Sequence, residues 1–259
     1  MSNKNQRNQP VLKKLFSVLD KNAPDDYRGA YKMLSTNIEF ISVAQKCKNI
    51  MLTSTIANEG KTNCVINLAL TLANQGKKVC VVECDLRRPS IHRFLDTKRS
   101  AVGLTHVLKG EIELENAIRN INDTSVSVLL AGVTPPNPSE VLASEKMQAI
   151  IKELESKYDF VLYDTPPAMI ISDAAVLGKS MDATFLVVKH NSTEKKMVKK
   201  AKENLENAGI KIRGVILSCF TNRKANPKGV HDYKVYEYIY YDSNGTSSNR
   251  TGMKEDNND

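Results

Sequence analysis

The chain has 259 residues, enough for one α/β domain with tails, and its 41% apolar and 25% charged residues are typical of a soluble globular protein. No apolar run approaches the ~20 residues of a membrane helix, no secretory signal peptide is visible, and the five cysteines form no zinc-ligand pattern. These features predict a cytoplasmic protein with reduced thiols. The net charge of +8 is compatible with an anionic ligand, nucleic acid or an acidic membrane surface, and does not choose among them.

Taken in chain order, residues 1–24 are polar and predict a flexible N-terminal arm, after which helices and apolar strands alternate. Predicted helices span residues 26–44, 61–74, 104–108, 114–118, 139–157 and 194–207. Predicted strands span residues 49–53, 78–84, 127–130, 160–163, 183–188 and 214–217. Strands made of continuous apolar runs with helices between them indicate an α/β fold with a mostly parallel sheet covered on both faces. We assign residues 25–221 to this domain.

Residues 54–62 follow a predicted strand, begin a helix and read STIANEGKT. Such a loop points backbone N–H groups and the positive end of the helix dipole at a phosphate, as in a P-loop. Lys61 would reach the β- and γ-phosphates, and the Thr62 hydroxyl would ligate Mg²⁺. The alternative is a helix start with an exposed lysine. The predicted nucleotide-binding residues are Ala57, Asn58, Glu59, Gly60, Lys61, Thr62 and Asn63.

Acidic residues follow two further predicted strands. Glu83 and Asp85 end one strand, and could hold Mg²⁺ or orient an attacking hydroxyl; the alternative is an acid–arginine turn of structural value only. Asp164 directly follows another strand and is an expected Mg²⁺ ligand. Ligands of parallel sheets bind at the carboxyl ends of the strands, where these segments meet. The candidate catalytic residues are Lys61, Glu83, Asp85 and Asp164, and the candidate metal ligands are Thr62, Glu83 and Asp164.

Residues 222–259 differ in composition from the rest of the chain. Five of the nine tyrosines gather there, and the last stretch, rich in Ser, Asn and Gly, predicts disorder. This tyrosine-rich tail is either a set of phosphoryl acceptors or an aromatic packing segment. The candidate autophosphorylation sites are Tyr233, Tyr236, Tyr238, Tyr240 and Tyr241.

Several motifs together resemble those of the bacterial tyrosine kinases of capsule and exopolysaccharide synthesis, in their Gram-positive form. The motifs are residues 54–62, residues 85–89 (DLRRP), residues 135–140 (PPNPSE), residues 164–167 (DTPP) and the tyrosine cluster. In that family the first, second and fourth look like Walker A, Walker A′ and Walker B. This chain has Glu83 where the family usually carries an aspartate.

The resemblance implies a P-loop kinase that uses ATP and Mg²⁺ and autophosphorylates its tail in trans. It also implies three partners: a second copy of the chain, a membrane-anchored polysaccharide co-polymerase that activates the kinase, and a tyrosine phosphatase. The cytoplasmic protein would be recruited to the inner face of the cell membrane by its activator.

Two rival functions share the fold. A partition- or positioning-type P-loop ATPase would carry an additional lysine near the start of the P-loop, and residues 55–59 contain none. A catalytically weak, ATP-binding scaffold of a polysaccharide export system would bind nucleotide without phosphoryl transfer. No nucleic-acid partner is expected, because only net charge favours one and no readout motif is present.

Overall fold

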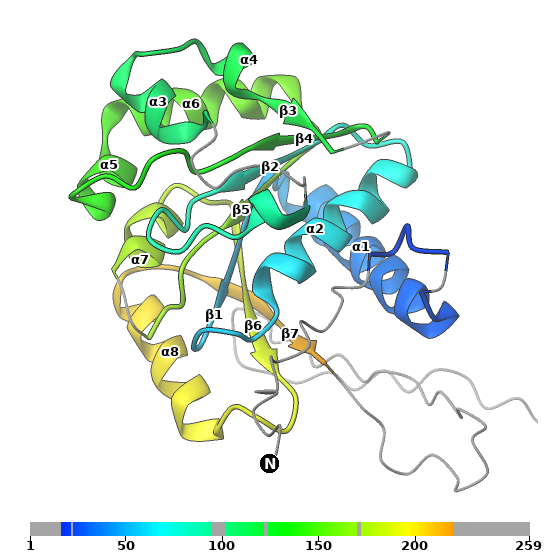
Figure 1. Ribbon diagram of the computed structural model, residues 1–259. Coiled ribbons are helices and arrows are strands. Elements are labelled where there is room, and N and C mark those ends of the chain that lie inside the picture. Colours follow the sequence, from blue (N-terminus) through cyan, green and yellow to red (C-terminus); the bar gives the residue numbers. More distant parts are fainter. Residues whose placement is uncertain (1–16, 22, 95–101, 122–123, 170–171, 220–259) are drawn as a thin grey trace, which may run out of the picture.

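The computed structural model describes residues 17–21, 23–94, 102–121, 124–169 and 172–219, which form a helix-covered sheet (Figure 1). The strands are β1 (Asn49–Ser54), β2 (Val79–Glu83), β3 (Arg119–Asn120), β4 (Val126–Leu129), β5 (Phe160–Asp164), β6 (Ala183–Lys189) and β7 (Ile212–Ser218). Their order across the sheet is β3-β4-β2-β5-β1-β6-β7. Every neighbouring pair is parallel except β3 and β4. The predicted mostly parallel α/β sheet is confirmed.

The helices cover both faces of the sheet. They are α1 (Asp25–Gln45), α2 (Lys61–Asn74), the 3-10 helix η1 (Ile91–Phe94), α3 (Leu104–Lys109), α4 (Leu114–Ala117), α5 (Pro138–Ala143), α6 (Glu145–Lys157), α7 (Asp173–Gly178) and α8 (Lys195–Asn207). Helices α1 and α2 pack on one face, and α3 to α8 lie on the other (Figure 1).

Burial on both faces explains why the strands are continuous apolar runs. Every residue of β1, β2 and β5 is buried. Neighbouring side chains on a strand point to opposite faces, so Leu52 joins the core under α1 and α2 while Met51 joins the core under α3 to α6. The three central strands are therefore fixed from both sides, and the loops that follow them start from a rigid edge.

The structure differs from the predicted elements at a few places. The single helix predicted over residues 139–157 is broken at Ser144, which has an extended backbone and whose Oγ accepts a hydrogen bond from Met147 N to begin α6. Helix η1, helix α7 and strand β3, which have four, six and two residues, were not predicted. Segments this short give only a weak periodic pattern.

Part of the predicted arm belongs to the packed domain. Val18 is buried, and its N–H donates to Asn67 Oδ1 of α2 at 2.7 Å. Arg28 of α1 donates to the carbonyls of Val18 and Asp20. Among the described residues, no helix is long and apolar enough to cross a membrane.

Candidate active site

The loop between β1 and α2 has the backbone shape of a phosphate-binding loop. Asn58 and Gly60 both have left-handed backbone angles, with φ of 65° and 80°. Glycine adopts this region without strain, and asparagine does so more readily than most other residues. The two turns bring the chain round to Lys61, the first residue of α2, so the N-terminus of that helix faces the loop.

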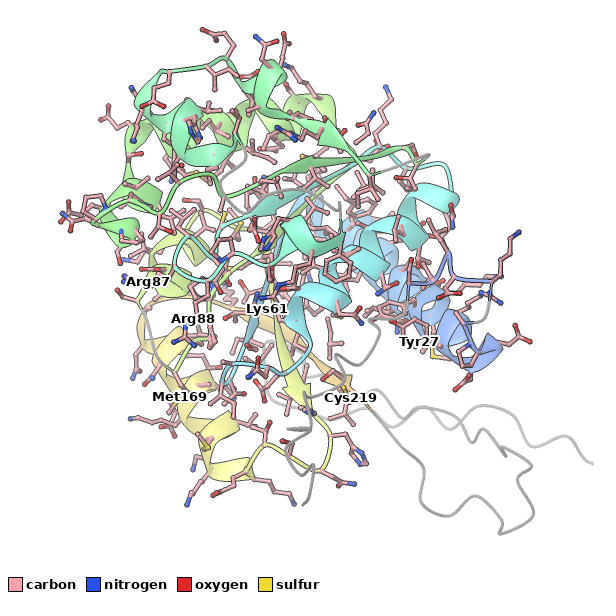
Figure 2. All side chains as sticks on the ribbon, in the orientation of Figure 1. Tyr27, Lys61, Arg87, Arg88, Met169 and Cys219 are labelled. Atoms are coloured by element: carbon pink, nitrogen blue, oxygen red, sulfur yellow. The ribbon has the colours of Figure 1, made fainter. Side chains whose placement is uncertain are left out.

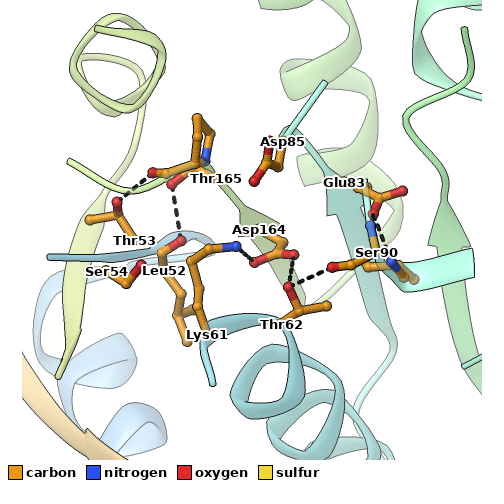
Figure 3. A network of polar contacts seen from close by, with 12 residues as sticks. Leu52, Thr53, Ser54, Lys61, Thr62, Glu83, Asp85, Ser90, Asp164 and Thr165 are labelled. Carbon is orange, nitrogen blue, oxygen red and sulfur yellow. Dashed lines mark hydrogen bonds and ion pairs between the residues drawn. The ribbon is translucent and has the colours of Figure 1, made fainter. Parts of the chain in front are cut away.

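Lys61, Thr62 and Asp164 form one cluster of polar contacts (Figure 3). Lys61 Nζ makes an ion pair with Asp164 Oδ1, and Thr62 Oγ1 donates to Asp164 Oδ2 at 2.7 Å. Asp164 is fully buried and Lys61 nearly so. Burial raises the pKa of the Asp164 carboxyl, and the neighbouring Lys61 charge opposes that shift. The P-loop lysine and hydroxyl therefore both bind the carboxylate at the end of β5.

Glu83 lies beside Asp164 but points elsewhere. The two residues are in register on neighbouring strands, and Glu83 is buried. Glu83 Oε1 accepts the N–H groups of Ser90 and, at 2.7 Å, Ile91; Oε2 accepts that of Ala131 at 3.1 Å. Burial raises the pKa of Glu83, and these backbone hydrogen bonds oppose the shift.

Asp85 is the second acid of this segment and is half-buried. Its Oδ1 accepts the N–H of Arg88 at 2.9 Å. Figure 3 shows its carboxylate near Asp164, and its charge is among the causes that raise the pKa of Asp164. Of the two acids in this segment, Asp85 is the one that is partly exposed, and its carboxylate lies near Asp164 in the Lys61 cluster.

Glu59 shapes the P-loop from inside. Its buried carboxylate accepts Ile56 N at 2.9 Å within the loop, and the hydroxyl of Thr193 beyond β6. Its backbone carbonyl accepts Ser218 Oγ at the end of β7. Of the other predicted loop residues, Ala57 and Asn58 are exposed, and Asn63 Nδ2 donates to the Tyr27 hydroxyl at 3.1 Å.

A second polar cluster at this edge was missed from the sequence. Arg87 binds Asp173 through two hydrogen bonds, Nε to Oδ2 at 2.9 Å and Nη2 to Oδ1 at 3.2 Å, and Ser139 Oγ also donates to Asp173. Asp173 is fully buried in α7. Figure 2 shows Arg87 and Arg88 at the carboxyl edge of the sheet, as Lys61 is. Arg87 and Ser139 stand in motifs noted above, whereas nothing in the sequence singled out Asp173.

Ser90 was also missed. Its Oγ lies 3.0 Å from Thr62 Oγ1, although 28 residues separate the two along the chain. Figure 3 shows Ser90 between Glu83 and Thr62. A serine after the DLRRP segment carries no sequence signal by itself.

The donor set fits a magnesium nucleotide better than a protein-only metal site. The described part of the chain contains no group of three or more His, Cys, Asp or Glu side chains that could hold a metal. Mg²⁺ in nucleotide sites takes one or two protein oxygens and completes its shell with phosphates and water. Thr62 Oγ1 and the Asp164 carboxylate are oxygens of this kind, and the ammonium of Lys61 is a positive charge that could bind a phosphate. The tail tyrosines lie outside the described residues.

Comparison with known proteins shows the family. A profile described as "AAA domain" matches residues 47–208. The tyrosine-protein kinase YwqD of Bacillus subtilis is 39% identical over 221 residues, which cover 85% of this chain and 86% of that protein. The tyrosine-protein kinase wzc of Salmonella typhi is 32% identical over 82% of this chain, which spans only 29% of that longer protein.

Solved structures agree. The kinase domain of Escherichia coli tyrosine kinase ETK has a TM-score of 0.71 at 31% identity and covers 81% of this chain and 79% of its own. The chimerical protein CapA2B2 has a TM-score of 0.72 at 30% identity, covering 77% of this chain and 87% of its own. The septum site-determining protein MinD of Pyrococcus horikoshii, complexed with Mg-ADP, has a TM-score of 0.54 at 29% identity. The match covers 66% of this chain and 69% of the MinD chain. With a phosphate loop, two following acidic strand ends and these relatives, the chain belongs to the bacterial tyrosine kinases.

Proposed function

We propose that the chain is an ATP-dependent protein-tyrosine autokinase that phosphorylates its own C-terminal tyrosines in trans and regulates capsule or exopolysaccharide synthesis. The observation that carries the proposal is the convergence of Lys61, Thr62 and Asp164 at the carboxyl edge of the sheet, with Asp85 beside them. Relatives named tyrosine-protein kinases over most of the chain support the choice of reaction.

MgATP, when bound, would supply the γ-phosphoryl group and a divalent positive charge beside the phosphates. Lys61, which contacts Asp164 in this structure, would hold the phosphate oxygens of the nucleotide, and the backbone amides of the P-loop would donate hydrogen bonds to the phosphates. Thr62 Oγ1 and Asp164 provide the metal-binding oxygens. Asp85 orients the tyrosine hydroxyl and accepts its proton, which its half-exposed position permits. Glu83, the second acid predicted at this site, adds negative charge beside Asp164.

Nucleotide and Mg²⁺ use follow from the AAA domain match and from a structural neighbour that holds Mg-ADP. ATP as the phosphoryl donor is the finer proposal. The likeness to the CapA2B2 chimera supports a membrane-anchored co-polymerase as activator. We also propose that a tyrosine phosphatase removes the phosphate from the tail, and that the protein lies in the cytoplasm at the inner face of the membrane.

The test is phosphotyrosine formation followed by intact mass and peptide mapping. The purified full chain is incubated with MgATP, with and without a cytoplasmic peptide of the activator, beside Lys61→Met. We expect phosphate on Tyr233 to Tyr241 that is absent from the Lys61 variant, because the buried ammonium is lost. Nucleotide binding without phosphotyrosine in either condition would instead favour the regulatory scaffold.

A further inference from the structure

The side chain of Glu83 is occupied by the backbone. Both of its oxygens accept main-chain N–H groups, two from Ser90 and Ile91 and one from Ala131. A carboxylate offers about four lone-pair directions, so three of them are taken. These bonds close the loop that leaves β2 and join it to the end of β4. Glu83 thereby fixes the position of the Ser90 backbone.

Ser90 in turn reaches the P-loop. Its hydroxyl lies 3.0 Å from Thr62 Oγ1, and Thr62 Oγ1 lies 2.7 Å from Asp164 Oδ2 (Figure 3). Ile91, the next residue, is fully buried in the core on the α2 face of the sheet. Ser90 is therefore held on one side by the Glu83 carboxylate and on the other by core packing.

The direction of the hydrogen bonds follows from the chemistry of the groups. An ionised carboxylate only accepts, so Thr62 donates its one proton to Asp164. Thr62 Oγ1 then accepts the proton of Ser90. One lone pair of Thr62 Oγ1 remains for a metal ion, and the two hydrogen bonds select the χ1 rotamer that presents it.

We propose that Ser90 is a positioning residue for Mg²⁺, which it serves by orienting the Thr62 hydroxyl, and that Glu83 acts through Ser90 rather than as a ligand of the metal. The longer side chain of glutamate suits this role, because it carries the carboxylate one methylene further from β2, toward the amides of residues 90, 91 and 131. The inference rests on the proposed use of MgATP at this site.

The experiment measures how strongly Mg²⁺ tightens ADP binding, which needs no kinase activity. Isothermal titration of ADP with Mg²⁺ and with EDTA gives two dissociation constants, and their ratio reports the metal site. We expect Ser90→Ala to reduce the ratio about three- to tenfold, the contribution of one hydrogen bond, with the EDTA constant unchanged. Ser90→Thr keeps a hydroxyl and should restore the ratio. Ser127→Ala is the matched control, because Ser127 is a half-buried serine of β4 whose hydroxyl bonds Asn120 on β3, away from the Thr62 cluster.

Glu83→Gln should shift the ratio in the same direction, and adding Ser90→Ala to it should change the ratio little further. An unchanged ratio in Ser90→Ala, or an equal loss with EDTA, would overturn the role of Ser90. If the double variant loses the product of the two single losses in this ratio, the two residues act independently. That result would overturn the action of Glu83 through Ser90. A wild-type chain whose ADP binding responds to Mg²⁺ but which forms no phosphotyrosine would contradict the kinase function and leave the Ser90 result standing.

Discussion

Two buried carboxylates lie side by side in this protein, and their partners differ. Asp164 on β5 and Glu83 on β2 are in register and both buried. Asp164 binds the side chains of Lys61 and Thr62, whereas Glu83 binds three backbone amides. A side-chain partner can rotate away to meet a ligand, but a backbone amide in a packed loop cannot. In the proposed mechanism, the comparison separates an acid that exchanges its contacts during the reaction, Asp164, from an acid that holds the loop around it, Glu83.

The largest expected effect comes from removing the exchangeable acid. Asp164→Asn keeps the size of the side chain but removes the charge that pairs with Lys61 and that we propose binds the metal. We expect the initial rate of autophosphorylation to fall on the order of a hundredfold or more, as loss of one preorganised charged group does. The rate is measured with radiolabelled ATP, and circular dichroism checks the fold. A rate within threefold of wild type would place the metal-binding acid elsewhere.

Glu59 shares features of both acids, because it binds the backbone of Ile56 and the side chain of Thr193. In Glu59→Gln the new NH₂ group is a donor and cannot accept a hydrogen bond from Ile56 N or from the Thr193 hydroxyl. One buried polar group is therefore left without a partner. We expect MgADP affinity to fall about tenfold, near 1.4 kcal/mol. Calorimetry measures the affinity, and Thr193→Val, which removes a single hydroxyl, should cost less. Equal losses in the two variants would show that the backbone contact of Glu59 contributes nothing.

Asp173 is a buried acid whose side-chain partners lie outside the phosphate site. Replacing it should lower stability without changing nucleotide binding. Asp173→Asn weakens both bonds from Arg87 and the one from Ser139. The Arg87 side chain is 39% exposed, so solvent screens the pair. We expect a loss of about 1–2 kcal/mol of unfolding free energy, which lowers Tm by about 2–8 °C.

Differential scanning calorimetry of the nucleotide-free protein measures this change. The Mg²⁺ dependence of ADP binding should stay at the wild-type value in Asp173→Asn. A changed Mg²⁺ dependence would show that the Asp173 cluster contributes to the metal site and not only to stability.

The smallest effect is expected on the surface. Lys157 binds Glu115 and Glu153 at 2.8 Å each, and these acids raise its pKa. All three side chains are exposed, and exposed ion pairs contribute little to stability. Lys157→Ala should therefore leave Tm and kinase rate within experimental error. A clear fall in Tm would mean that the short distance of these ion pairs, without burial, is enough for the carboxylates to contribute to stability.

The sequence predicted six of the seven strands and most of the reactive groups from patterns that are local in the chain. Strands buried on both faces are continuous apolar runs, and the acids at their ends located Asp85 and Asp164. Lys61 was located by the P-loop motif that follows β1. Glu83 was also located, but the direction of its carboxylate depends on where residues 90 and 131 fold. Ser90 and Asp173 could not be found, because their roles arise from contacts across 28 and 86 residues. The break at Ser144 was hidden inside an uninterrupted helical pattern.

The hydrogen bond from Ser218 to the carbonyl of Glu59 fixes the point at which the tail is tethered. Tyr233 and Tyr241, two of the proposed phosphoryl acceptors, follow Ser218 by 15 and 23 residues, which span at most about 50 and 80 Å when fully extended. A covalent tether gives an acceptor a high local concentration near its own P-loop whatever the protein concentration. Transfer between molecules must compete with this attached acceptor, so lengthening the segment between Ser218 and Tyr233 would change the balance without altering a single residue of the site.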